Sequence, residues 1–481
     1  MTTAADLRDW IALLEREGEL VRVSAEVDPH LEVTEIVDRV VKAGGPALLF
    51  ENPKSEHPLL INQFGTERRM CLAFGAGSLD DVGRRLGDVL EMQPPQGLAE
   101  KVRGLKKLKS IADSQPKGVR SGPVQEVVLT GDEVDLRRLP VQTCWPGDAA
   151  PFITLPAVIT KDPRTGGRNV GMYRLQVIDE RTTAMHWQIH KDGRADYLLA
   201  DGKLEVAVAL GLDPVTAYAA SAPLPKHVDE FMLAGFLRGE PVELVRCKTV
   251  DLEVPARSEI VIEGYIEKGE LRDEGPFGDH TGYYTPAEPF PVVHVTCVTH
   301  RRDPIYPSII VGVPPQEDVW LGKATERLFL PAVRMTLPEV VDYDLPFMGA
   351  FHNLAIVSIK KAFPGHARKV MHAVWGTGLL SLTKGVVVVD DWVDVHDYGQ
   401  VMWQVGANVD PARDVLLSEG PLDHLDHAPT RQFMGGKIGI DATAKLEAEG
   451  YVREWPEVIR MSDEVRALVD RRWAEYGIND P

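Results

Sequence analysis

The period of the apolar residues changes twice along this chain of 481 residues, and those changes restrict its possible folds more than any other feature. In the first part, helical patterns at 6–17 and 31–43 are followed by short apolar runs at 47–50 and 59–62. Helical stripes that alternate with buried strands indicate an α/β arrangement. We therefore expect an N-terminal α/β domain over residues 1–120.

Beyond residue 124 the apolar period shortens towards two, the period of a half-buried strand. Strand patterns separated by Gly, Pro and Asp turns occur at 127–129, 157–160, 173–178, 184–190, 259–266 and 292–299. Many strands with few helices predict an antiparallel barrel or sandwich across residues 121–325, with a helical insert at 229–237.

In the last third of the chain the alternation of helix and strand returns. The runs 354–359 and 385–389 are apolar, as in buried parallel strands, and the segment 366–375 between them has a helical period. This pattern predicts a C-terminal α/β domain over residues 326–460 and a terminal helix within 461–481. The whole chain is expected to be of mixed α/β (α+β) class.

Composition excludes several classes of function. The chain has 53 basic and 72 acidic residues and a formal net charge of −19, which argues against a nucleic-acid-binding surface. Residues 1–20 lack the features of a signal peptide, and no apolar run approaches membrane-spanning length. The 4 cysteines have no metal-type spacing, as is typical of a reduced, cytoplasmic protein. The basic stretch 101–109 is interpreted as a solvated helix face.

The sequence Glu-Gly-Pro-Phe-Gly-Asp-His-Thr-Gly-Tyr-Tyr at residues 274–284 contains two acids, one on each side of a Gly-Pro-x-Gly turn. Gly275 and Gly278 permit backbone conformations closed to other residues, and the proline between them has a fixed φ. A stiff turn of this kind can hold Glu274 and Asp279 at the set separation that proton transfer requires. The spacing alone favours a solvated acidic hairpin.

The segment 185–190 alternates between apolar and polar side chains. As a strand, which Trp and Ile favour, it would turn one face to a core and the other to a cavity. The apolar face would carry Met185, Trp187 and Ile189, and the polar face would carry His186, Gln188 and His190. Two imidazoles and an amide on one face make a candidate site, and structural histidines are the alternative.

These motifs follow one another in the order found in the UbiD family of prenylated-flavin-dependent decarboxylases, which this chain resembles over most of its length. The matching segments are Asn-Val-Gly-Met-Tyr-Arg at 169–174, those around His190 and Glu230, and 251–256, 274–284, 366–375 and 436–443. The resemblance implies a split β-barrel of flavin-reductase type for the middle domain. It also implies a homo-oligomer, a dimer or a hexamer, in which the C-terminal helix packs on a neighbouring subunit.

The resemblance further implies a cofactor site. Its metal ligands would be Asn169, His190 and Glu230, a mainly hard donor set that suits Mn²⁺ or Mg²⁺. This ion, with K⁺ nearby, would anchor the phosphate of prenylated FMN. The residues expected to line the cofactor are Met172, Tyr173, Arg174, His186, Trp187, Gln188 and Lys191, the last of them beside the phosphate.

The catalytic trio of the family, an acid, an arginine and a second acid, corresponds to Glu274, Arg174 and Asp279 in this chain. Loss of an aromatic carboxyl group as CO₂ leaves an electron pair on carbon, which needs an electron sink and then a proton. Prenylated FMN is the implied sink. Arg174 would orient the carboxylate, Asp279 would deliver the proton, and Glu274 would tune it through Arg174. A purely structural Arg174–Glu274 ion pair is the alternative.

The expected function is the non-oxidative decarboxylation of a polyprenylated hydroxybenzoate or naphthoate in quinone biosynthesis. A flavin prenyltransferase would supply the cofactor, and the protein would be cytoplasmic and peripheral at the inner face of the membrane. Three alternatives remain: a decarboxylase of simple hydroxybenzoates, a flavin-free metal hydrolase that uses Asn169, His190 and Glu230, and a catalytically silent subunit of a larger complex.

Three further motifs are interpreted as structural. Asp-His-Leu-Asp-His at 423–427 resembles a ligand cluster but is expected to be a packed loop. Asp390 and Asp391 follow a buried strand and are expected to form a turn or a cap. The Gly-x-Gly-x-x-Ser sequence at 376–381 is expected to connect a helix to a strand.

Overall fold

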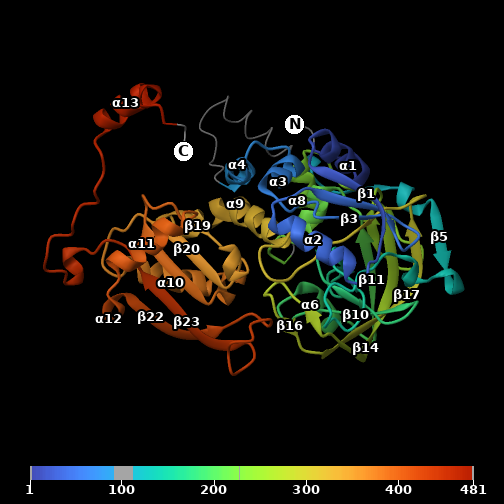
Figure 1. The fold of residues 1–481 in the computed structure, drawn as a ribbon. Coiled ribbons are helices and arrows are strands. Elements are labelled where there is room, and N and C mark those ends of the chain that lie inside the picture. Colours follow the sequence, from blue (N-terminus) through green and yellow to red (C-terminus); the bar gives the residue numbers. More distant parts are fainter. Residues whose placement is uncertain (1–2, 91–111, 227, 479–481) are drawn as a thin grey trace, which may run out of the picture.

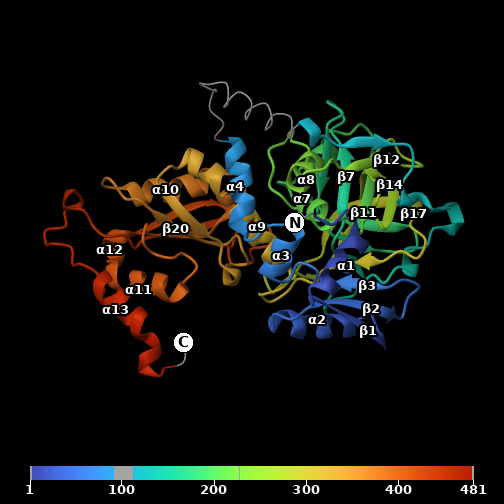
Figure 2. The ribbon, with the colours of Figure 1, turned by 90° about the horizontal axis from the view of Figure 1, so that it is seen from above.

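The computed structural model describes residues 3–90, 112–226 and 228–478, and these residues form two lobes (Figure 1). One lobe contains the N-terminal and middle domains, and the other contains the C-terminal domain. Helix α9 (Asp318–Thr336) lies between the lobes in two perpendicular views (Figures 1 and 2). The basic stretch at 101–109 lies outside the described residues.

The N-terminal domain is a small sheet covered by helices. Its strand order is β1-β2-β3-β18, in which β1 and β2 are parallel and β18 comes from the end of the middle domain. The two helices and two strands expected before residue 63 are confirmed. The elements are α1 (Leu7–Arg16), β1 (Leu20–Val27), α2 (Glu32–Lys42), β2 (Ala47–Pro53), β3 (Leu59–Ile61), α3 (Glu67–Phe74), α4 (Leu79–Leu90) and β18 (Tyr306–Pro307).

Helix α1 shows how the sequence sets these boundaries and how the domain is fastened. The Asp6 carboxylate caps the helix by accepting hydrogen bonds from two backbone N–H groups, and Gly18, with a φ of 73°, follows its end. Fully buried Glu259 of the middle domain accepts hydrogen bonds from Arg8 and Arg301, each at 2.9 Å. Arg301 also donates to Asp6 at 2.9 Å, so one ion network joins the two domains.

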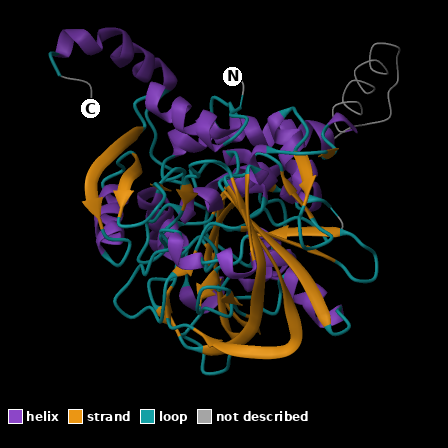
Figure 3. Cartoon of the chain, turned by 90° about the vertical axis from the view of Figure 1, so that its right-hand side faces the viewer, coloured by secondary structure: helices purple, strands orange, loops and turns teal. Residues whose placement is uncertain are grey.

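The middle domain is a curled antiparallel sheet that forms a half-barrel, which confirms the predicted barrel-like architecture (Figure 3). Its order is β6-β9-β10-β17-β14-β11-β7-β8, with β5 paired to β17. These strands are β5 (Val127–Thr130), β6 (Phe152–Ile153), β7 (Ala157–Lys161), β8 (Arg168–Gly171), β9 (Leu175–Val177), β10 (Thr182–Met185), β11 (Lys203–Leu210), β14 (Ile260–Glu274) and β17 (Glu288–His300).

Smaller elements surround the half-barrel, and the helical insert expected at 229–237 is present as α8. A three-stranded sheet contains β4, which pairs with β12 although it precedes the expected domain boundary at 120. The elements are β4 (Lys117–Val119), α6 (Asp192–Leu199), α7 (Pro214–Ala219), α8 (Glu230–Arg238), β12 (Glu243–Arg246), β13 (Glu253–Pro255), β15 (Phe277–Gly278) and β16 (Tyr284–Thr285).

The expected strand at 184–190 is wrong beyond Met185. Pairing of β10 with β17 ends at Ala184, and the chain then leaves the sheet and turns into α6. Trp187 is buried against Tyr197, whereas Ile189 is 50% exposed, so the predicted apolar face does not exist. The start of a helix within a few residues overrides the strand preference of Trp and Ile.

The C-terminal domain is a sheet of order β19-β20-β21-β23-β22, in which β20, β21 and β23 are parallel. Helix α10 packs on one face and α11 on the other, because they contact different alternating residues of β20. The predicted parallel strands and their connecting helix are confirmed. The elements are β19 (Val340–Asp344), β20 (Leu354–Ile359), α10 (His366–Gly376), β21 (Gly385–Asp390), α11 (Tyr398–Asn408), α12 (Pro411–Asp414), β22 (Val415–Pro421) and β23 (Met434–Asp441).

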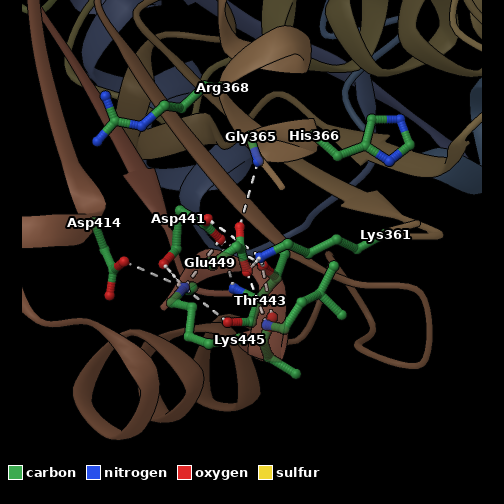
Figure 4. Close-up of polar contacts among 12 residues, drawn as sticks. Lys361, Gly365, His366, Arg368, Asp414, Asp441, Thr443, Lys445 and Glu449 are labelled. Carbon is green, nitrogen blue, oxygen red and sulfur yellow. Dashed lines mark hydrogen bonds and ion pairs between the residues drawn. The ribbon is translucent and has the colours of Figure 1, made fainter. Parts of the chain in front are cut away.

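A polar network at the carboxyl ends of these parallel strands fixes the start of the C-terminal tail (Figure 4). Lys361 donates to Thr443 at 3.0 Å and to Glu449 at 2.7 Å. Asp390, at the end of β21, accepts a hydrogen bond from the backbone N–H of Ala444 at 2.9 Å. Its carbonyl oxygen accepts from Val393 at 3.1 Å, which confirms the expected turn at the end of the strand. The network is satisfied internally, so it acts as a structural clasp.

Beyond this clasp the chain runs to α13 (Asp463–Arg472), which lies away from the body of the C-terminal domain (Figure 1). No residue of α13 is buried, and Val465 and Leu468 are exposed on it. In the described part of the chain, no helix combines the length and the apolar character needed to cross a membrane.

Helix α9 is held on both sides. Against α4 it packs at Gly83, where a Cβ would lie 2.3 Å from the carbonyl oxygen of Arg327. Against the C-terminal sheet, Lys323 donates to fully buried Glu326 at 2.9 Å and to fully buried Asp344. With His396, these two acids have ligand atoms within 4.8 Å of one another, but the Lys323 ammonium already supplies the positive charge that a metal ion would bring.

We expect Lys323→Met to lower the free energy of unfolding by about 3 kcal/mol, because it removes the cation that two buried carboxylates share and leaves them only their separate contacts with Arg327 and His396. The matched control is Lys42→Met, which removes an exposed i,i+4 pair with Asp38 and should cost less than about 1 kcal/mol. Denaturant unfolding followed by tryptophan fluorescence measures both. An unchanged midpoint for Lys323→Met would contradict the role given to this lysine.

Candidate active site

Arg174 lies between two buried carboxylates, so the structure brings the predicted trio together. Its Nε and Nη2 donate to Glu274, the last residue of β14, at 2.6 and 3.1 Å. Its Nη1 donates to Asp279, which follows β15, and its Nη2 also donates to Thr285 at 3.2 Å. Glu274 is 0% and Asp279 5% exposed. The alternative of a solvated acidic hairpin is therefore wrong.

The turn between the two acids is shaped by its glycines. Gly275 has a φ of 94°, a region that favours glycine, as expected. Gly278 is required for a different reason: a Cβ there would lie 2.3 Å from the Trp145 ring. The backbone N–H of Gly278 donates to Asp148 at 2.8 Å, which fixes the residue just before Asp279. The turn thus places Asp279 beside Arg174.

His186 is the fourth member of this network. Its Nδ1 lies 2.9 Å from Glu274 Oε2 and 3.0 Å from Arg174 Nη2. Because the two N–H groups of Nη2 already donate to Glu274 and Thr285, Nδ1 carries the proton and donates it to Glu274. The opposite nitrogen, Nε2, is buried and has no hydrogen-bond partner among the described residues. Burial, and then the charge of Arg174, lower the pKa of His186, so the ring is neutral. A neutral ring thus offers a free acceptor.

Charge pairing keeps both acids ionised. Burial raises the pKa of Glu274, but Arg174 and the hydrogen bond from His186 outweigh it and bring the pKa to about 2. For Asp279 burial acts in the same direction, and the charges of Arg174 and His280 again outweigh it and lower the pKa. Neither carboxyl group therefore holds a proton at neutral pH.

Two histidines extend the network towards the C-terminal domain, and the sequence did not single them out. His280 donates from its backbone N–H to Asp279 Oδ1 at 2.7 Å, and its Nδ1 lies 2.8 Å from the same oxygen. Its Nε2 lies 2.8 Å from Nε2 of His352, in the segment before β20. The only available signal was that His280 belongs to the 274–284 motif.

The Asp-His-Leu-Asp-His loop is packed, as expected, but it packs on the site. His424 lies 2.8 Å from Glu288 and its ring centroid is 6.2 Å from that of His186. The His427 ring lies 4.1 Å from the Tyr283 ring. This loop between β22 and β23 therefore closes the site from the C-terminal domain.

The residues expected to line the cofactor lie around this network. Trp187 is buried against Tyr173, and its Nε1 has no hydrogen-bond partner among the described residues. Met172 and Gln188 are half-buried. Burial lowers the pKa of Lys191, and the nearby acids only partly oppose this effect. Unpartnered polar atoms and a half-buried lysine leave hydrogen-bonding capacity for a polar ligand with an anionic group.

Of the predicted metal ligands, Asn169 and Glu230 lie close to each other. Glu230 begins α8, is 9% exposed, and accepts a hydrogen bond at 3.0 Å from Val170, the neighbour of Asn169. Burial, partly offset by this bond, raises the pKa of Glu230 to about 7. His190 lies exposed in the turn before α6. The joint ligand set of the three residues stays a prediction.

Comparison with known proteins places this arrangement in a family. Three family models match, described as the N-terminal, Rift-related and C-terminal domains of 3-octaprenyl-4-hydroxybenzoate carboxy-lyase, at residues 11–87, 117–314 and 319–442. An uncharacterized protein of Archaeoglobus fulgidus is 55% identical over 476 residues, which cover 98% of each chain.

Solved structures of UbiD-class enzymes also match this chain over nearly its whole length. The UbiD-class enzyme HmfF from Pelotomaculum thermopropionicum, in complex with FMN, matches with a TM-score of 0.79 and 34% identity, covering 94% of this chain and 97% of that one. Vanillic acid decarboxylase from Sedimentibacter hydroxybenzoicus, in closed form, matches with a TM-score of 0.88 and 28% identity over 100% of both chains. With Arg174, Glu274 and Asp279 in contact and all three domains matched, this chain belongs to the UbiD family of carboxy-lyases.

Proposed function

We propose that this protein decarboxylates an aromatic carboxylic acid without net oxidation, using prenylated FMN and a divalent metal ion, Mn²⁺ or Mg²⁺, with K⁺ nearby. The observation that carries this proposal is the buried arrangement in which Arg174 joins Glu274 and Asp279. Its completeness argues against a catalytically silent subunit. The described residues also leave polar atoms for a flavin, namely Nε2 of His186 and Nε1 of Trp187.

The cofactor, when bound, supplies a sink for the electron pair that the departing CO₂ leaves behind. Arg174 has five N–H donors, and the described residues occupy four of them through Glu274, Asp279 and Thr285. The remaining N–H on Nη1 can orient the substrate carboxylate. Asp279 then transfers a proton to the carbon that loses CO₂. Glu274 acts through Arg174 and His186, which it holds in place.

Two substrate classes compete within this activity. We propose a polyprenylated hydroxybenzoate or naphthoate of quinone biosynthesis first, because the matching family models are described by an octaprenyl hydroxybenzoate. A simple hydroxybenzoate is the second candidate, since a vanillic acid decarboxylase matches the whole chain with a TM-score of 0.88. A prenyl chain would also draw the protein to the inner face of the membrane.

Protein co-expressed with a flavin prenyltransferase should show flavin absorption and release CO₂ from an aromatic acid. Turnover should be higher for a prenylated acid than for the same acid without the prenyl chain, and equal turnover would favour the simple hydroxybenzoate.

Asp279→Asn should retain the flavin and lose about 10²-fold or more in turnover. The matched control, Asp273→Asn, alters an exposed acid on β14 and should leave turnover unchanged. Metal-dependent hydrolysis without flavin absorption would overturn the proposal in favour of a hydrolase.

The metal part of the proposal predicts that Glu230→Ala loses metal and cofactor together, because the ion would hold the cofactor phosphate. Metal content by mass spectrometry and flavin content by absorption measure the two losses. Glu240→Ala, which changes an exposed acid after α8, is the control and should lose neither. Full flavin occupancy in metal-free Glu230→Ala protein would contradict the anchoring role.

We also propose that α13 packs on a second copy of this chain in a dimer or hexamer. The helix has no buried residue, and its Val465 and Leu468 lie three residues apart on one exposed face. An exposed apolar stripe of this kind is typical of a contact surface.

Removal of residues 452–481 should therefore lower the oligomeric state, as measured by light scattering during size-exclusion chromatography. Val465→Asp with Leu468→Asp should have the same effect, because it places charges in an apolar contact. Arg466→Asp alters a neighbouring exposed position of the same helix and serves as the control. An unchanged oligomer after truncation would overturn this assignment.

A further inference from the structure

The hydrogen bonds of Asp279 leave its proton-donating role incomplete. One of its oxygens accepts from Arg174, and the other accepts two hydrogen bonds from His280, at 2.7 and 2.8 Å. A carboxylate held by this many donors is ionised at rest. A group that delivers a proton in each turnover must therefore receive it from a neighbour.

We propose that His280 is the proton reservoir of this site: its Nδ1 holds the proton that Asp279 passes to the substrate carbon. This inference rests on the proposed decarboxylation and extends it to a residue that does not touch the reacting carbon. His280 is adjacent to Asp279 in the chain, and its Nδ1 lies 2.8 Å from Asp279 Oδ1. No rearrangement of the backbone is needed for the transfer.

The surroundings of His280 favour its charged form. Asp279 contacts it from its own turn, while Asp318 faces it from the start of α9 and Asp423 faces it from the loop after β22. Burial lowers the pKa of His280, but the hydrogen bond and charge of Asp279 outweigh burial, and the pKa is raised. The imidazolium therefore balances the second carboxylate, as Arg174 balances the first.

His352 keeps this imidazolium in place from the C-terminal domain. The two Nε2 atoms are 2.8 Å apart, so one donates and the other accepts. Burial, and then the charge of His280, lower the pKa of His352 to about 4, which makes His352 the neutral acceptor. Asp423 and Asp426 also face His352. The Phe351 ring stacks on His280 with centroids 5.2 Å apart, so the ring is oriented from both sides.

The bond between the carboxyl carbon and the substrate carbon breaks, CO₂ leaves, and the electron pair remains with the substrate. Nδ1 of His280 passes its proton to the ionised Asp279, and Asp279 delivers this proton to the substrate carbon as the new C–H bond forms, so Asp279 is ionised again afterwards. His280 becomes neutral while its Nε2–H stays bonded to His352, and solvent water restores the imidazolium before the next turnover.

The competing interpretation is that His280 only props Asp279 in position. Proton exchange distinguishes the two, because a prop of similar shape would preserve it. His280→Gln keeps a side-chain amide beside Asp279 but carries no transferable proton. We expect this variant to bind flavin normally and to exchange the product hydrogen with solvent deuterium about 10²-fold more slowly. His57→Gln changes a half-buried histidine of the N-terminal domain and is the matched control.

The pH dependence has a definite sign. Because the pKa of His280 is raised, its imidazole is protonated at low pH and loses its proton as the pH rises through that pKa. The rate at which the wild type exchanges the product hydrogen with solvent should therefore fall at pH values above the pKa of His280. In His280→Gln the charge of Arg174 still lowers the pKa of Asp279, so the exchange rate should already decline at a lower pH than in the wild type. His352→Leu removes the acceptor of the imidazolium and should move the alkaline decline in exchange to lower pH.

Two further measurements decide the case. In His280→Ala, added imidazole should restore exchange at least tenfold at a pH where imidazole is cationic, which a structural prop would not require. In the full-length wild type labelled with ¹⁵N-histidine, the resonances lost in His280→Gln should report a charged ring at neutral pH. Normal exchange in His280→Gln, or a neutral His280 at pH 6, would overturn the inference. The charge measurement requires no substrate, so it is independent of a failure to find decarboxylation.

Discussion

The rest of the site depends on the position of the Arg174 guanidinium between two buried carboxylates. Its five donors point in fixed directions, so the bidentate contact with Glu274 at 2.6 and 3.1 Å also determines where Nη1 meets Asp279. Two buried carboxylates this close would otherwise repel each other and take up a proton. Arg174 therefore sets both the geometry of the acids and their ionisation.

The same ionisation creates the need for a separate proton supply. Because Glu274 has a pKa of about 2 and that of Asp279 is also lowered, the two acids together carry two negative charges, of which Arg174 balances one. His280 supplies the second positive charge at the position where a transferable proton is useful. A site with an ionised acid and an adjacent imidazolium can store its proton on the imidazole and pass it to the acid during turnover.

Sequence reasoning recovered the architecture but only part of the site. Glu274 and Asp279 could be paired because one short turn holds both, whereas Arg174 lies 100 residues away from Glu274 and entered only through the family resemblance. His352 could not be predicted, because it reaches His280 only through the packing of the C-terminal domain across 72 residues. The strand expected at 184–190 ends at Met185 because the chain then turns into α6, and the local strand preference of Trp187 and Ile189 does not reveal that turn.

Helix α9 explains how residues from separate domains stay in register. Its first residue, half-buried Asp318, faces His280. One to two turns later, Lys323 donates to Asp344 of the C-terminal sheet and Glu326 accepts from the backbone N–H of Leu345. One rigid element thus carries a charge at the site and fastens the domain that provides His352. A change in the position of α9 would alter the environment of His280 directly and the position of His352 indirectly. The ion network in the middle of this helix is therefore a structural requirement for the proton supply at its end.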